Sequence, residues 1–123
     1  MFIRRVPKFE YHAPASLQEA LDLLARYGEK AEVFAGGTDV IVAMKRREKV
    51  PENLVNLKGI GGLQEIESYG KEGIKIGGLT TLGELERSTV VKEKLPVLRD
   101  ALKVMAAPQV RNLATIGGNL CSA

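Results

Sequence analysis

The fold of this chain is most constrained by a short apolar run that is followed directly by a glycine pair and then by a helical pattern. The run ends in Val33-Phe34-Ala35, and Gly36-Gly37-Thr38-Asp39-Val40 follows directly. Glycine has no Cβ, so backbone N–H groups at such a turn can approach an anion closely and adopt positive φ. Thr38 is placed to cap the helix that follows. The pattern predicts a strand, a tight turn and a helix, with a candidate phosphate site at the turn.

A second glycine pair lies near the other end of the chain, in Ala114-Thr115-Ile116-Gly117-Gly118-Asn119-Leu120. Thr115 precedes this pair, and its hydroxyl can donate a hydrogen bond. Two such loops could hold one diphosphate from both sides. Neither loop has the spacing of a Rossmann fingerprint or of a P-loop, and Gly77-Gly78 shows that glycine pairs are common in turns. A purely structural turn therefore remains the alternative for each pair taken alone.

The first half of the chain alternates strand and helix patterns. Residues 8–12 and 53–57 are predicted to be extended, as is the run from 31 to 35, and a helical pattern covers 40–44. A capping box at Ser16 starts an earlier helix that ends at Gly28. Its predicted apolar face consists of Leu17, Ala20, Leu21 and Leu24. This order predicts a βαβ-like unit with the first glycine turn at the carboxyl edge of a small parallel sheet.

The second half has a different pattern. We expect a joint between subdomains at residues 59–62, giving subdomains 1–58 and 59–123, although an ordinary loop is equally compatible. Residues 63–69 and 73–79 predict an antiparallel hairpin. A capping box from Thr81 to Glu84 predicts a helix to about Arg87. A further amphipathic helix, with Pro96 near its first turn and Pro108 after its end, is marked by Leu95, Leu98, Leu102 and Met105.

Composition excludes several classes of function. The chain has 123 residues, which suit one domain or two subdomains, and its formal net charge of +3 is weak evidence for a nucleic-acid partner. The basic cluster at residues 45–49 fits a solvated helix end. No apolar stretch is long enough to span a membrane, and the N-terminus lacks a secretory signal. The single Cys121 permits no internal disulfide and no metal cluster, so we expect a cytoplasmic protein.

Three segments together resemble the FAD-binding medium subunit of molybdenum hydroxylases, the group of carbon monoxide dehydrogenase, xanthine dehydrogenase and 4-hydroxybenzoyl-CoA reductase. They are residues 35–39 (AGGTD), residues 77–81 (GGLTT) and the long stretch 108–120 (PQVRNLATIGGNL). The resemblance covers the whole chain in order, and the combination is specific although each motif alone is not. It implies an α+β fold of the vanillyl-alcohol oxidase type, with a small N-terminal α/β subdomain and a second subdomain built on an antiparallel sheet.

The resemblance also implies the cofactor, the site and the partners. FAD is the implied cofactor, with its diphosphate over the two glycine loops, and Met105 stands near the flavin unless it is only a core residue. The implied cofactor-binding residues are Val33, Phe34, Ala35, Gly36, Gly37, Thr38, Asp39, Val40, Met105, Thr115, Ile116, Gly117, Gly118 and Asn119. The implied partners are a molybdenum-cofactor subunit and a 2Fe–2S subunit, whose electrons FAD passes to an acceptor such as NAD or a quinone. The flavin carries the redox chemistry, so no catalytic residue and no metal site is expected in this chain.

Several alternatives stay open at this level. Relatives continue beyond the second glycine motif, so the chain is either a fragment or is completed by a partner chain that supplies the C-terminal half. A truncated assembly module that docks to partner subunits without binding flavin is the competing function. Asp39 would repel a bound diphosphate and is expected to cap backbone N–H groups or to face a ribose hydroxyl. His12 and Cys121 are expected to be a lone surface histidine and a small buried cysteine rather than flavin attachment sites.

Overall fold

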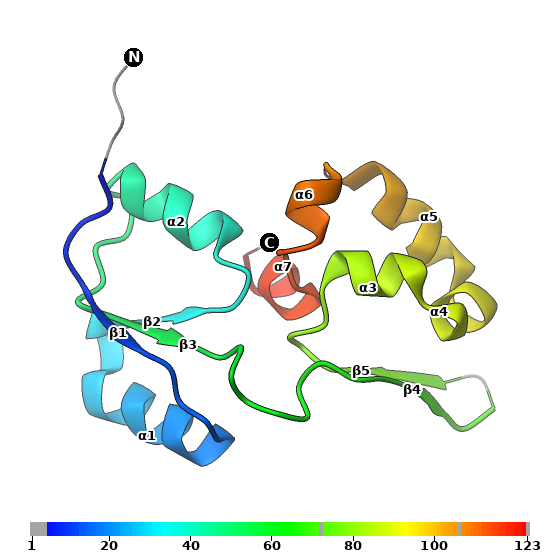
Figure 1. Ribbon diagram of the computed structural model, residues 1–123, viewed down its shortest axis with the longest axis horizontal. Coiled ribbons are helices and arrows are strands. Elements are labelled where there is room, and N and C mark those ends of the chain that lie inside the picture. Colours follow the sequence, from blue (N-terminus) through cyan, green and yellow to red (C-terminus); the bar gives the residue numbers. More distant parts are fainter. Residues whose placement is uncertain (1–4, 72, 106, 123) are drawn as a thin grey trace. The chain divides into compact units, whose positions relative to one another are not determined.

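A computed structural model describes residues 5–71, 73–105 and 107–122, and it has the mixed α+β composition expected from the sequence. The chain divides between Gly61 and Gly62 into two compact units (Figure 1). Within the described residues, no helix has both the length and the apolar character needed to cross a membrane.

The first unit is built on a three-stranded parallel sheet. Its strands are β1 (Glu10–His12), β2 (Ala31–Phe34) and β3 (Asn53–Asn56), and β3 lies in the middle of the order β1-β3-β2. Helix α1 (Leu17–Tyr27) and the 3-10 turn η1 (Gly28–Lys30) connect β1 to β2, and α2 (Thr38–Lys45) connects β2 to β3. The two helices lie on opposite sides of the sheet (Figure 1). The predicted parallel β/α arrangement is confirmed.

Helix α1 begins and ends where the sequence predicts, but it is rotated relative to the expected face. The Oγ atom of Ser16 accepts the N–H of Glu19 at 3.1 Å, and Gly28 ends the helix with φ 53°. Ala20 is buried, whereas Leu17 and Leu21 are 53% and 51% exposed. The buried side is instead completed by half-buried Leu23, Leu24 and Tyr27. The predicted face was therefore wrong for Leu17 and Leu21, because Ala20 and Leu24 belong equally to the neighbouring stripe at helical spacing.

The second unit combines a hairpin with a group of helices. Strands β4 (Ile66–Tyr69) and β5 (Gly73–Ile76) pair antiparallel, as predicted, although each is shorter than expected. The helices are α3 (Leu82–Arg87), α4 (Thr89–Lys94), α5 (Pro96–Met105), α6 (Pro108–Arg111) and α7 (Ile116–Ser122). Helices α3 and α5 match predicted segments, and the capping box at α3 is confirmed, with Glu84 N–H to Thr81 Oγ1 at 3.1 Å and Thr81 N–H to Glu84 Oε2 at 3.2 Å. Helices α4, α6 and α7 were not predicted.

Apolar side chains from the helices form the core of the second unit. Leu82, Leu85, Val91 and Leu102 are buried together, and Ile66, Ile74 and Ile76 of the hairpin pack against them. Each strand therefore directs alternate residues toward the helices, as a strand half-covered on one face requires. Leu95 and Met105, which were expected to continue the apolar face of α5, are exposed.

Candidate functional site

The first glycine loop joins the carboxyl end of β2 to the first turn of α2. Gly37 is the N-cap, with φ 75° and ψ −1°, and Thr38 is the first helical residue. The N-cap position predicted for Thr38 is therefore occupied by Gly37. A Cβ built on Gly37 would collide with the ring of Phe34, so both the backbone angle and the packing call for glycine here.

Because the N-cap is glycine, helix α2 starts without a side-chain cap among the described residues. The N–H groups of the first turn of an α-helix have no partner within the helix. They point along the axis toward the loop, where the helix dipole favours negative charge. The loop therefore fits a phosphate or diphosphate group, and this fit comes from the backbone rather than from any charged side chain.

Asp39 lies in this first turn and is exposed. Within the described part of the chain its carboxylate caps no backbone N–H of α2, so the capping role expected for it is not observed. An acidic residue in the first turn stabilises the helix through the dipole.

The second glycine pair lies inside a helix and not in an open turn. Thr115, which is buried, is the residue before α7, and its Oγ1 accepts the N–H of Gly118 at 3.0 Å. The N–H of Asn119 donates to the carbonyl of Thr115, also at 3.0 Å. Thr115 therefore caps α7 through its hydroxyl, a role different from the expected donation to a ligand.

The first residues of α7 are also fixed by the segment that precedes α3. The N–H of Ile116 donates to the carbonyl of Thr80 at 2.9 Å, and the N–H of Gly117 donates to the carbonyl of Gly78 at 2.8 Å. The amides from Ile116 to Asn119 thus all have partners within the protein. They are not available to a phosphate in this arrangement, which corrects the expectation that both glycine loops offer N–H groups in the same way.

The role of residues 78–80 in positioning α7 was not predicted from the sequence. Gly77-Gly78 was treated only as an ordinary turn, yet the carbonyls of Gly78 and Thr80 position the start of α7. The resemblance had already placed residues 77–81 among the matching motifs, and that was the available signal.

Two other residues considered from sequence, His12 and Cys121, are also placed by the structure. The Nε2 atom of His12 lies 2.9 Å from Oδ1 of Asn53, and the ring of His12 lies 5.2 Å from that of Tyr27. These contacts explain His12 without a ligand. Cys121 is exposed, so the expectation of a buried cysteine was wrong. Among the described residues, no group of histidine, cysteine and carboxylate side chains could hold a metal ion.

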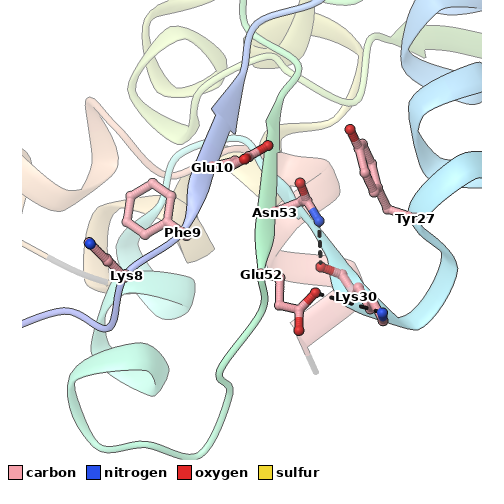
Figure 2. A pocket seen from close by; sticks show the side chains of 7 residues that line it. All are labelled: Lys8, Phe9, Glu10, Tyr27, Lys30, Glu52 and Asn53. Atoms are coloured by element: carbon pink, nitrogen blue, oxygen red, sulfur yellow. Dashed lines mark hydrogen bonds and ion pairs between the residues drawn. The ribbon is translucent and has the colours of Figure 1, made fainter.

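A shallow cavity of about 620 Å³ lies at the opposite edge of the parallel sheet (Figure 2). It is near the amino ends of β1 and β3 and is lined by Lys8, Phe9, Glu10, Tyr27, Lys30, Glu52 and Asn53. Lys30 Nζ and Glu52 Oε2 are 3.9 Å apart, and Asn53 Nδ2 donates to the carbonyl of Lys30 at 3.4 Å. None of the site residues predicted from sequence lines this cavity. Its lining carries charges of both signs, so it offers no field that selects an anion.

The parallel sheet leads through β2 into a helix whose N-cap is Gly37, with no side-chain cap among the described residues, and such a helix start is suited to binding a phosphate group. The sequence matches the family described as FAD binding domain in molybdopterin dehydrogenase over residues 7–123. The chain belongs to this family of FAD-binding domains.

Relatives within the family agree with this assignment. The chain is 42% identical over 114 residues to the carbon monoxide dehydrogenase medium chain of Hydrogenophaga pseudoflava, covering 93% of this chain and 39% of the relative. It is also 42% identical over 111 residues to the corresponding chain of Afipia carboxidovorans, covering 90% and 38%. A solved structure of carbon monoxide dehydrogenase from Hydrogenophaga pseudoflava superposes with a TM-score of 0.91 at 41% identity, covering 94% of this chain and 40% of that one. The chain thus spans about two fifths of the length of these relatives.

Proposed function

We propose that this chain binds FAD as part of the flavin subunit of a molybdenum-containing hydroxylase or dehydrogenase. The observation that carries the proposal is the first turn of α2 behind Gly37, which has no side-chain cap among the residues that the structure describes, in a chain of the FAD-binding family. When bound, FAD accepts and donates electrons, and the protein binds and orients it. Electrons would arrive from a 2Fe–2S subunit, downstream of a molybdenum-cofactor subunit that acts on the substrate, and would leave to a separate acceptor.

The two loops contribute to binding in different ways. In the first loop, Val33 to Val40, the N–H groups at the start of α2 would hold the diphosphate. In the second, Thr115 to Asn119, the amides are already used, so contact would come from the glycine surface and from the exposed side chain of Asn119. Exposed Met105 would offer an apolar contact to the cofactor.

The finer architecture is part of the same proposal. We assign residues 1–58 to the N-terminal α/β part of an FAD-binding fold of the vanillyl-alcohol oxidase type and residues 59–123 to the start of its second part. The parallel sheet of the first unit and the antiparallel hairpin of the second support this assignment. The division that the structure places between Gly61 and Gly62 lies close to the proposed boundary.

Isothermal titration calorimetry tests the proposed function. The purified protein is titrated with FAD, ADP, FMN and riboflavin. ADP is expected to bind and to compete with FAD, because the first loop recognises a diphosphate, whereas FMN and riboflavin should compete poorly. FMN binding as tightly as FAD would contradict the assignment of the diphosphate to this loop.

The electron-transfer part needs a separate measurement. The protein is purified together with the products of neighbouring genes, and its visible spectrum is recorded. Flavin and iron–sulfur absorbance in one complex supports the proposal. A stable complex that contains no flavin would instead favour an assembly module.

A further inference from the structure

Tyr11 and Asn56 form a hydrogen-bonded pair on the same sheet that carries the first glycine loop. Asn56 is the last residue of β3, and its Nδ2 donates to the hydroxyl oxygen of Tyr11, in β1, at 2.6 Å. The side chain of Tyr11 is well exposed, with the residue 58% accessible. An exposed aromatic ring held in place by a hydrogen bond is an unusual feature in a chain with few aromatic residues.

The hydrogen bonds of Asn56 fix the orientation of the pair. Its Oδ1 accepts the backbone N–H of Lys58 at 2.9 Å, so the nitrogen of the amide must face Tyr11. The Tyr11 oxygen is therefore an acceptor in this bond, which leaves its O–H to donate elsewhere. Asn56 Nδ2 likewise has a second hydrogen to donate. The pair thus presents an aromatic face together with two neutral donors.

Strand register places this pair beside the glycine loop. Asn56 is the register partner of Phe34 in the neighbouring strand, so their side chains lie on the same face of the sheet. The ring of Phe34 occupies the space where a Cβ of Gly37, the N-cap of α2, would lie. A row from Phe34 through Asn56 to Tyr11 therefore leads away from the start of α2 across the three strands. Neighbouring strands are about 4.8 Å apart. The step from Asn56 to Tyr11 is diagonal, because the register partner of Tyr11 is Leu54, two residues before Asn56 on the same face.

We propose, resting on the function proposed above, that Tyr11 and Asn56 form the adenosine subsite of the bound dinucleotide. With the diphosphate at the start of α2, the adjoining nucleoside extends along this row. The ring of Tyr11 stacks on the adenine base, and the donors of Tyr11 and Asn56 contact the sugar. Adenine suits this position better than the flavin ring, because one exposed aromatic side chain at a solvated edge can cover a small base but cannot enclose a large reactive ring.

The test compares ADP with inorganic pyrophosphate, which lacks the nucleoside. Both are titrated by calorimetry against the purified protein and its Tyr11→Leu variant. Base–aromatic stacking of ordinary strength predicts that Tyr11→Leu weakens ADP binding between about fivefold and a hundredfold. Pyrophosphate affinity should not change, because the diphosphate contacts are backbone N–H groups of α2.

Further variants separate the contribution of the Tyr11 ring to ADP binding from that of the hydrogen-bond donors, and one variant controls for the loss of an exposed tyrosine elsewhere. Tyr11→Trp keeps a stacking surface and should retain most of the affinity for ADP. Asn56→Asp keeps the oxygen that accepts the N–H of Lys58 but replaces a donor by a negative charge, so ADP binding should weaken. Tyr69→Leu is the matched control, since Tyr69 is 73% exposed on β4 and belongs to the other unit.

The outcomes distinguish this inference from the proposed function. If Gly37→Ala weakens both ADP and pyrophosphate while Tyr11→Leu changes neither, the diphosphate site stands and the adenosine subsite is wrong. If Tyr11→Leu weakens riboflavin and FMN but not ADP, the pair contacts the flavin half and the assignment is also wrong. If Gly37→Ala leaves both affinities unchanged, the proposed diphosphate site fails, and the adenosine subsite fails with it.

Discussion

The N–H of Gly117 donates to the carbonyl oxygen of Gly78 at 2.8 Å, and a Cβ built on Gly117 would lie 2.6 Å from that same oxygen. The start of α7 is thus held against the segment before α3 at a distance that only glycine permits. From the sequence, Gly117 was expected to contact a bound ligand. The structure gives it a packing role of its own.

Gly117→Ala is therefore expected to destabilise the fold. The added methyl group must displace backbone atoms of Gly78 and would strain their hydrogen bond, at a cost of about 1–3 kcal/mol, as for other overpacked sites. Urea unfolding followed by circular dichroism measures the change. Gly78→Ala is the control on the other side of the same contact, because a Cβ there meets no atom within 4 Å. Equal stability of the two variants would show that the close approach is not limiting.

Gly37→Ala should reduce both stability and ADP affinity. Its φ of 75° is costly for a residue with a side chain, by about 1–2 kcal/mol, and the methyl group would also meet the ring of Phe34. Any shift of the loop also moves the N–H groups at the start of α2. Gly28→Ala provides the comparison, since Gly28 has φ 53° and open space around its Cβ position. That variant should lose stability alone, and a loss of ADP binding there would indicate a general effect of unfolding.

Arg111→Met is expected to destabilise the second unit by about 2 kcal/mol. The NH1 atom of Arg111 donates to the carbonyl of Leu102 at 2.8 Å and lies 3.3 Å from Glu86 Oε2, and the Arg111 side chain is only 11% exposed. The Nε atom of Arg111 is buried and has no hydrogen-bond partner among the described residues. Because the substitution also removes this unsatisfied donor, the free energy of unfolding should fall by less than the lost contacts alone would cause.

Arg46→Met serves as the control for that measurement in thermal unfolding experiments. Arg46 forms a 3.9 Å ion pair with Glu48, and its side chain is 65% exposed. Exposed pairs of this kind contribute at most about 1 kcal/mol. If Arg46→Met and Arg111→Met lower the melting temperature equally, the burial of Arg111 has no energetic consequence.

Glu67→Gln is expected to lower the pKa of Glu65. A hydrogen bond to Glu67, together with its negative charge, raises the pKa of Glu65 above its usual value, while Lys75 acts in the opposite direction. A raised carboxyl pKa means that the folded state binds this proton more tightly. The resulting stabilisation is present below the pKa of the unfolded chain and is lost as pH rises through the folded pKa.

Carboxyl chemical shifts measured by NMR across an acid titration check this directly. Glu65 should titrate at lower pH in Glu67→Gln than in the unmodified protein. Glu93→Gln, an exposed substitution on α4, should leave the titration of Glu65 where it was. An unchanged Glu65 titration in Glu67→Gln would show that the two carboxyl groups do not interact in solution.

Capping residues and turn motifs in the sequence correctly predicted where nearby helices begin. Ser16 and Thr81 cap α1 and α3 as predicted, because an N-cap acts on N–H groups only two or three residues away. The parallel arrangement of the first unit also followed from the order of its elements. The motifs around both glycine pairs led to the family that the comparison with known sequences establishes.

Partners distant in sequence were decided only by the tertiary structure. Leu17 and Leu21 fit an apolar face on α1, yet the contact with β3 selects the stripe that contains Ala20. The two glycine pairs look alike in sequence. Gly37 begins a helix that no side chain of the described residues caps, whereas the N–H of Gly117 already donates to the carbonyl of Gly78. The local sequence determines which backbone conformations a segment can adopt at low energy. Whether an N–H then remains available to a ligand depends on which distant carbonyl the fold brings to it.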